Sequence, residues 1–248
     1  MQITKNWFYK LSEINSEEII IEDNLIIAIF DDLCSVPHPD KGRLGGVFVS
    51  IWENSKVEIF WVLENKDDFK LKVIQEKDNS NLKLNYLILS KNISPLQGGD
   101  VWKTEGGKIK AKIESVLNSN FVKSNVKIIS IVWNWGEIDL DWIIKIEKGI
   151  EKVDWNLSEE NIFLWDTGMV KWIPTLLVWS SDVVASHSCK MERISDEKLF
   201  YLRSRWLGRE NALNMIIEAK IENLFSCLRM YNKDFYEEIL DNILGKFK

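Results

Sequence analysis

The chain has 248 residues, of which 46% are hydrophobic and 28% charged, and its formal net charge is -6. This balance is typical of a globular protein with a packed core, and it excludes wholesale disorder and a strongly basic nucleic-acid-binding protein. The three cysteines are too few and too scattered for a disulfide framework. No apolar run approaches the ~20 residues of a membrane helix, and the N-terminus lacks a signal-peptide pattern. We therefore expect a cytoplasmic protein with no membrane contact.

The N-terminal half predicts strands and hairpins. Residues 25–30 form a continuous apolar run, which is typical of a buried strand. Residues 31–46 contain two prolines and several glycines, which predict a long loop. Residues 47–63 alternate between apolar and polar positions on both sides of a short polar turn, and this pattern predicts a β-hairpin.

The middle of the chain continues this pattern. Apolar residues recur at helical spacing over 108–117, which predicts a short amphipathic helix. A second hairpin is predicted within 126–144. An offset of 81 residues aligns the two predicted hairpins, with Trp52 on Trp133 and Trp61 on Trp142. This alignment fits either an internal duplication of 47–63 and 128–144 or two unrelated hairpins of the same general pattern.

The C-terminal part predicts a last hairpin over 186–207 and then a lasting change of period. Apolar residues at helical spacing predict one helix over 209–230 and a second that starts near Asp234 and ends at Leu244. The predicted fold class is therefore α+β, a mostly antiparallel β-sheet built from hairpins with a C-terminal pair of α-helices. The predicted domains are an antiparallel β domain at 1–208 and a helical segment at 209–248.

Tryptophan is unusually frequent, with 12 residues in the chain. Trp61 and Trp142 share strand faces with aliphatic residues, which predicts that they pack in the core. Trp135 lies in a predicted turn beside Gly136, where burial is harder. It is therefore a candidate contact residue for another chain or a ligand.

Five of the six arginines fall between positions 193 and 229. On a strand, Tyr201, Arg203 and Arg205 would point the same way, and Arg209 follows shortly after. Guanidinium groups on one face suit phosphate or carboxylate recognition. The sequence leaves open whether this face contacts RNA, an acidic protein partner or only nearby carboxylates.

Both histidines and two of the three cysteines lie in two short segments. Cys34 and His38 form one pair, and His187 and Cys189 form the other. Such residues could hold zinc or form a Cys–His nucleophile pair, or the cysteines could be small buried residues. The spacing matches no standard zinc motif and no catalytic constellation is visible, so we expect no cofactor and no enzymatic activity.

The last third resembles a known family. Residues 163–168 read Phe-Leu-Trp-Asp-Thr-Gly, residues 170–174 end in Ile-Pro, and residues 203–208 read Arg-Ser-Arg-Trp-Leu-Gly. This layout resembles the small accessory subunit of type III-D CRISPR effector complexes, although Asp166 stands where that family has glycine.

The resemblance implies a non-catalytic subunit of an antiviral, RNA-guided ribonucleoprotein complex. Its implied partners are other protein subunits and RNA, with the arginine face as the contact. The alternative is a stand-alone acidic binding or immunity protein that blocks a partner enzyme, for which the acidic net charge would suit a basic target.

Overall fold

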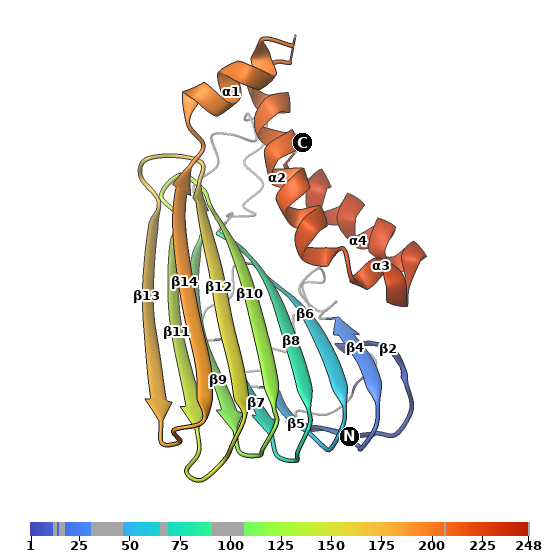
Figure 1. Ribbon diagram of the computed structural model, residues 1–248. Coiled ribbons are helices and arrows are strands. Elements are labelled where there is room, and N and C mark those ends of the chain that lie inside the picture. Colours follow the sequence, from blue (N-terminus) through green and yellow to red (C-terminus); the bar gives the residue numbers. More distant parts are fainter. Residues whose placement is uncertain are drawn as a thin grey trace.

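The fold is a stack of coils with two parallel β-sheets. A computed structural model describes residues 1–11, 14, 18–30, 47–64, 69–90, 107–205 and 207–247. The described strands form two seven-stranded sheets, which we call the odd sheet and the even sheet (Figure 1). The odd sheet runs in the order β1 (Gln2–Ile3), β3 (Glu18–Ile21), β5 (Val47–Ile51), β7 (Phe69–Gln75), β9 (Lys108–Leu117), β11 (Glu137–Ile146) and β13 (Met169–Val178). The even sheet runs in the order β2 (Trp7–Lys10), β4 (Ile26–Phe30), β6 (Lys56–Glu64), β8 (Asn81–Leu89), β10 (Lys123–Val132), β12 (Val153–Phe163) and β14 (Val183–Arg193).

Consecutive strands alternate between the sheets, so each coil gives one strand to each sheet. Every neighbouring pair is parallel, and Glu137 of β11, for example, pairs with Lys108 on one side and Met169 on the other. Each coil therefore advances by about 30 residues in this part of the chain. This architecture is that of a parallel β-helix.

The corners between the sheets explain why the strands do not fold back as hairpins. Asn24, Asn54 and Asn79 each occupy such a corner with a positive φ of 61°, 55° and 59°. Asparagine tolerates this left-handed conformation better than most residues. The amide of Asn54 donates to the carbonyl of Asp78 in the next coil, at 3.1 Å, and the corresponding amides in the neighbouring coils do the same. Each corner is thus hydrogen-bonded to the next coil, which keeps the coils in register.

The main core fills the space between the two sheets. Trp61, Tyr86 and Trp142 lie there, each at most 1% exposed. The rings of Trp61 and Tyr86 stack at 6.3 Å, and Tyr86 meets Trp142 edge to face at 5.7 Å. The prediction that Trp61 and Trp142 are core residues is confirmed.

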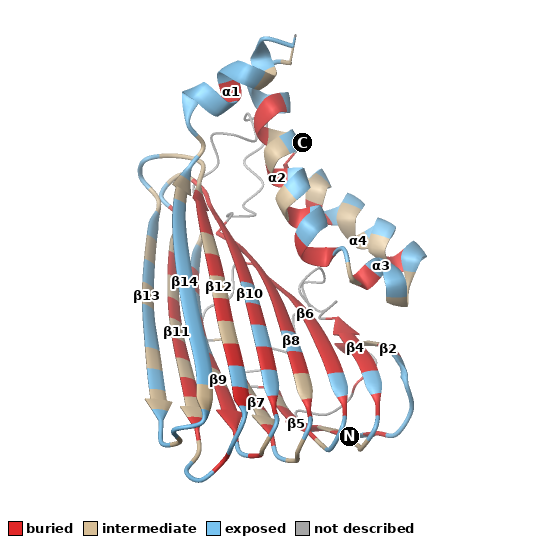
Figure 2. Cartoon of the chain, in the orientation of Figure 1, coloured by how far each residue is buried: buried red, intermediate tan, exposed pale blue. Residues whose placement is uncertain are grey.

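Four helices follow the last strand, and they cover the outer face of the even sheet (Figures 1 and 2). They are α1 (Asp196–Arg203), α2 (Arg209–Phe225), α3 (Leu228–Tyr231) and α4 (Lys233–Gly245). A second apolar cluster joins α2 and α4 to this face, for example through Phe30, Phe225 and Phe235. The side chain of Asn232, not Asp234, caps α4.

The predicted antiparallel fold is wrong. β5 and β6, expected to pair as the first hairpin, lie in different sheets, and so do β10 and β11 of the second. Residues 108–117 form β9 rather than a helix, and residues 186–207 form the end of β14 and then α1 rather than a hairpin. Alternation of apolar and polar residues with period two indicates that one face of a strand is buried. Parallel and antiparallel strands show the same alternation, so the sequence pattern could not reveal which strands pair.

The proposed duplication and the domain division at residue 208 stay predictions. Among the described helices, none is both long enough and apolar enough to cross a membrane.

The corner conformation generates a stability prediction. We expect Asn54→Val to lower the free energy of unfolding by about 1–2 kcal/mol, because a β-branched residue is strongly disfavoured at positive φ. Asn54→Gly is the matched control, and it should change stability by less than about 1 kcal/mol because glycine accepts this conformation. Urea unfolding followed by tryptophan fluorescence measures both. Equal destabilisation by the two variants would contradict the role given to the corner.

Candidate docking and metal-ligand site

One end of the β-helix is open. β13 and β14 are the outermost strands of their sheets, and no other strand in the described part of the chain pairs with their free edges. Both strands are largely exposed, in contrast to the buried rows of β4 to β12 (Figure 2). Several large apolar side chains of this coil are 40% to 68% exposed, namely Met169, Ile173, Leu176, Val178, Trp179, Val184 and Met191.

Long apolar strand edges are unusual in proteins that remain alone. β13 has 10 residues and β14 has 11. Natural sheets protect such edges with short strands, charges, prolines or a covering element, because free backbone groups recruit other strands. Pro174 in β13 is the only proline within the fourteen described strands, and its position is consistent with an edge strand. The end therefore has the features of a docking surface for another sheet.

The interior of the β-helix changes from apolar to polar at this end. One inward-facing column runs through Tyr86, Ile128, Glu159 and Cys189 on β8, β10, β12 and β14. Register places these residues side by side in successive coils. The column thus begins with carbon-rich side chains and ends with a carboxylate and a thiol. A neighbouring column ends in His187, next to Leu157 of β12.

Asn161 links the carboxylate and the thiol. Its Nδ2 donates to Glu159 Oε1 at 2.5 Å and lies 3.8 Å from Cys189 Sγ. Glu159 is 2% exposed and Asn161 is fully buried, yet Glu159 Oε2 and Asn161 Oδ1 have no hydrogen-bond partner among the described residues. Burial raises the pKa of Glu159, and the hydrogen bond from Asn161 only partly opposes this effect. Two buried oxygen atoms therefore lie beside the last strand of the even sheet without a hydrogen-bond partner among the described residues.

His187 and Cys189 complete the set of potential ligands. The imidazole of His187 packs on Trp172 of β13, with ring centroids 4.4 Å apart. Partial burial lowers the pKa of His187, which favours the neutral ring that binds metals. Burial, and then the nearby charge of Glu159, raise the pKa of Cys189.

The potential ligands of this end do not make a complete metal site. Imidazole, thiolate and carboxylate all bind iron or zinc. Within the described ranges, however, no three His, Cys, Asp or Glu side chains gather closely enough to hold a metal ion.

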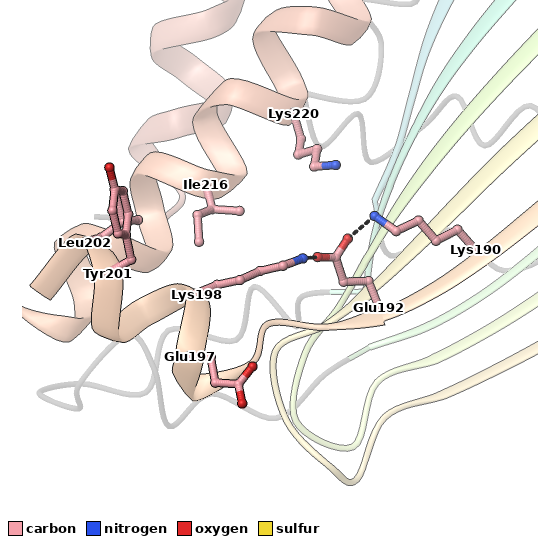
Figure 3. A pocket seen from close by; sticks show the side chains of 8 residues that line it. All are labelled: Lys190, Glu192, Glu197, Lys198, Tyr201, Leu202, Ile216 and Lys220. Carbon is pink, nitrogen blue, oxygen red and sulfur yellow. Dashed lines mark hydrogen bonds and ion pairs between the residues drawn. The ribbon is translucent and has the colours of Figure 1, made fainter.

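A groove lies between β14 and the first two helices, α1 and α2 (Figure 3). Its cavity of about 550 Å³ is lined by Lys190, Glu192, Glu197, Lys198, Tyr201, Leu202, Ile216 and Lys220. Burial opposes ionisation of Glu192, but hydrogen bonds from Lys190 and Lys198 outweigh it and lower the pKa of Glu192 to about 2.

The predicted arginine face is not on a strand. Tyr201 and Arg203 lie on α1, and Arg205 follows it in a turn. Arg205 Nη2 donates to the Tyr201 hydroxyl at 3.1 Å, while Arg209 begins α2 and lies 3.8 Å from Asp196. Tyr201 and Arg205 therefore do meet, because they are four residues apart around a helical turn. Their role as partner contacts stays a prediction.

The other predicted site residues have separate locations. Trp135 is 64% exposed in the turn between β10 and β11, with a φ of 58°. Its amide donates to Thr167 Oγ1 at 3.1 Å. Cys34 and His38 lie outside the described residues, so their meeting with His187 and Cys189 stays a prediction.

Glu159, Asn161 and Trp172 were missed as site residues. A signal for the first two exists in the sequence. In β12 the odd-numbered residues face the interior, beginning with Val153, Trp155 and Leu157. Glu159 and Asn161 continue this alternation, so polar side chains are expected at inward-facing positions. The sequence could not show that this polar end lies in an open coil.

Comparison with known proteins found similarity in the part of the chain that contains this end of the β-helix. Residues 109–220 match the family model described as the SufBD core domain of the SUF system for FeS cluster assembly. The iron–sulfur cluster assembly protein SufD of Escherichia coli K12 is 31% identical over 112 residues, which cover 45% of this chain and 26% of that protein. An iron–sulfur cluster assembly SufBD family protein of Staphylococcus haemolyticus is 28% identical over 93 residues, covering 38% of this chain and 20% of that protein.

These matches correct the resemblance drawn from the sequence. The aligned part spans about a quarter of E. coli SufD. The matched segment includes β9 to β14, α1 and part of α2, and therefore contains the whole stretch that resembled a type III-D CRISPR subunit. The CRISPR, antiviral and RNA-guided interpretation is contradicted, and so is the alternative of an immunity protein. The short motifs were misread because they mark the corner after β12 and the end of α1, and neither position implies RNA binding.

The ion pairs of Glu192 in the groove predict a contribution to the free energy of unfolding that is lost at acidic pH. Because the pKa of Glu192 is lower in the folded state than its ordinary value of 4.5, its contribution is complete above about pH 5 and is lost as the pH falls toward 2. We expect Glu192→Gln to lower the free energy of unfolding by about 1–2 kcal/mol at pH 7 but hardly at all at pH 2.5, after allowing for solvent screening. Urea unfolding at the two pH values measures this. An equal loss at both values would contradict the ionic origin of the effect.

Proposed function

We propose that this chain is a non-catalytic scaffold component of an iron–sulfur cluster assembly system. In this role it docks end to end on a second β-helix through the open coil of β13 and β14. The observation that carries the proposal is the coincidence of two features at that end. Long exposed edge strands with several apolar side chains and an incomplete set of potential metal ligands, Glu159, His187 and Cys189, occur together.

The physical argument begins with the backbone. An edge strand lacks one row of hydrogen bonds, and a parallel partner strand supplies it. Docking another sheet would also cover Leu176 and Val178, which face the interior and are 47% and 40% exposed. Removal of such apolar area from water contributes roughly 25 cal/mol per Å². Both terms favour association through this end.

The chemical argument concerns the cargo. Soft thiolate ligands suit iron–sulfur clusters, and imidazole is also found as a cluster ligand. A site completed only at a junction between two chains would hold a cluster less firmly than a closed set of four thiolates. That property suits a protein that builds a cluster and then gives it away. The similarity to proteins named for iron–sulfur cluster assembly supports this cargo over zinc.

Association through the open end is directly testable. We expect Leu176→Lys to weaken association with a second copy of the chain, or with purified E. coli SufD, by at least about tenfold, because it places a charge in the buried junction. Sedimentation equilibrium measures the dissociation constants. The matched control is Met215→Lys on α2, a residue of similar exposure (48% against 47%), which should leave association unchanged. Failure of both probes to associate, or equal loss in the two variants, would contradict docking through this end.

The cargo is tested separately under anaerobic conditions with ferrous iron and sulfide. We expect the chain to acquire visible absorption and acid-labile sulfide, and the double variant His187→Ala/Cys189→Ser to lose most of both. Cys227→Ser is the control, because Cys227 is a partly buried residue at the start of α3 and faces a different region. Equal loss in the control, or full retention in the double variant, would contradict a cluster site at the open end.

A further inference from the structure

A chain of five charged side chains joins the docking strand to the helices. Glu160 Oε1 accepts from Lys220 Nζ of α2 and from Lys190 Nζ of β14, both at 2.7 Å. Lys190 also contacts Glu192, and Glu192 contacts Lys198 of α1. The signs therefore alternate from α2 through β12 and β14 to α1. Figure 3 shows Glu192 between Lys190 and Lys198, with Lys220 extending from α2 above them.

This ionic contact differs in kind from the contact between the helices and the rest of the even sheet. β2, β4, β6, β8, β10 and β12 each contribute at least one buried apolar side chain to the cluster beneath the helices. β14, which is described over its whole length, contributes none. The cavity of about 550 Å³ separates it from α1 and α2 instead. The ion pair that joins β14 directly to a helix is that of Glu192 with Lys198 of α1, while Lys190 is linked to Lys220 of α2 only through Glu160 of β12.

The geometry points to an electrostatic clamp, by which α1 and α2 hold β14 in order for docking. β14 is hydrogen-bonded to β12 on one side only, so its backbone has fewer restraints than an inner strand. The clamp supplies a second restraint, directly from Lys198 to Glu192 and indirectly from Lys220 to Lys190 through Glu160. The side chain of Glu192 is only 9% exposed, whereas those of Lys190 and Lys198 are 55% and 56% exposed, so the restraint stays sensitive to salt. The apolar cluster keeps the helices on the sheet whether or not the clamp is closed.

The clamp has a regulatory consequence, which rests on the proposed docking role of β14. Coupling between two sites is reciprocal. A partner that orders β14 would strengthen the contact between α1 and β14. Conversely, a displacement of α1 or α2 would weaken the restraint on β14. The helical surface and the open end are thereby connected through five residues without a change elsewhere in the sheet.

Hydrogen–deuterium exchange of the intact chain tests the clamp without any partner. We expect Glu192→Gln, and separately Lys198→Met/Lys220→Met, to speed exchange over residues 183–193 by about fivefold to tenfold more than over residues 81–89 of β8, whose exchange follows the global stability. About 1 M NaCl should have a similar effect on the wild-type chain, because salt screens the partly exposed lysines. The matched control is Lys233→Met, which removes the exposed pair of Lys233 with Glu237, 3.6 Å apart on α4, and should change neither segment.

Two results would overturn the inference. Unchanged exchange over 183–193 in all variants would show that β14 does not depend on the ionic contact. Equal acceleration over 81–89 would show that the ion pairs stabilise the whole fold and not the docking strand. The outcome is distinguishable from a failure of the proposed function. If exchange responds as expected but Leu176→Lys leaves association unchanged, the clamp exists and docking through this end is wrong.

Discussion

Every coil of a parallel β-helix depends on its neighbours for backbone hydrogen bonds. An inner coil such as β11 and β12 finds partners on both sides, and its corner amides do the same. The last described coil has a partner on one side only. The open edge of β13 and β14 is therefore a direct result of the way this fold satisfies its backbone, and several apolar residues there are exposed.

Two apolar cores stabilise different parts of this arrangement. Large side chains such as Trp61 and Trp142 fill the space between the two sheets. The helices bury the outer face of the even sheet up to β12. Beyond β12 the apolar cover stops, and the ion pairs of Lys190 and Glu192 replace it. Polar groups thus collect on both faces of the last even strand, inside as Cys189 and His187 and outside as the clamp.

This arrangement unites the proposed docking and cargo roles at one place. A second β-helix that extended the sheets would supply hydrogen bonds to the edge and cover Leu176. It would also bring its own side chains close to His187 and Cys189, which are on the last strand of the even sheet. A cargo site formed in this way exists only while the two chains are associated, so its assembly and release follow the state of the junction. The neighbouring helices, coupled through Glu192, are well placed to influence that state.

The sequence by itself determined the inward faces of many strands, but it misassigned residues 108–117, which form β9, and residues 186–207. Period two identified most strands, helical spacing identified the C-terminal helices, and the apolar neighbours of Trp61 and Trp142 identified core residues. It could not determine which strands pair, because alternation describes one strand at a time and is silent about its neighbours. The corners with Asn24 and Asn54 decide this point, since their amides bond to the next coil. Only the tertiary structure placed Glu159, Asn161 and Cys189 together at an open end, because residues about 30 positions apart become adjacent only when coils stack in register. Tyr201 and Arg203 were assigned to a strand, but the local cap of Ser195 starts a helix that contains both residues.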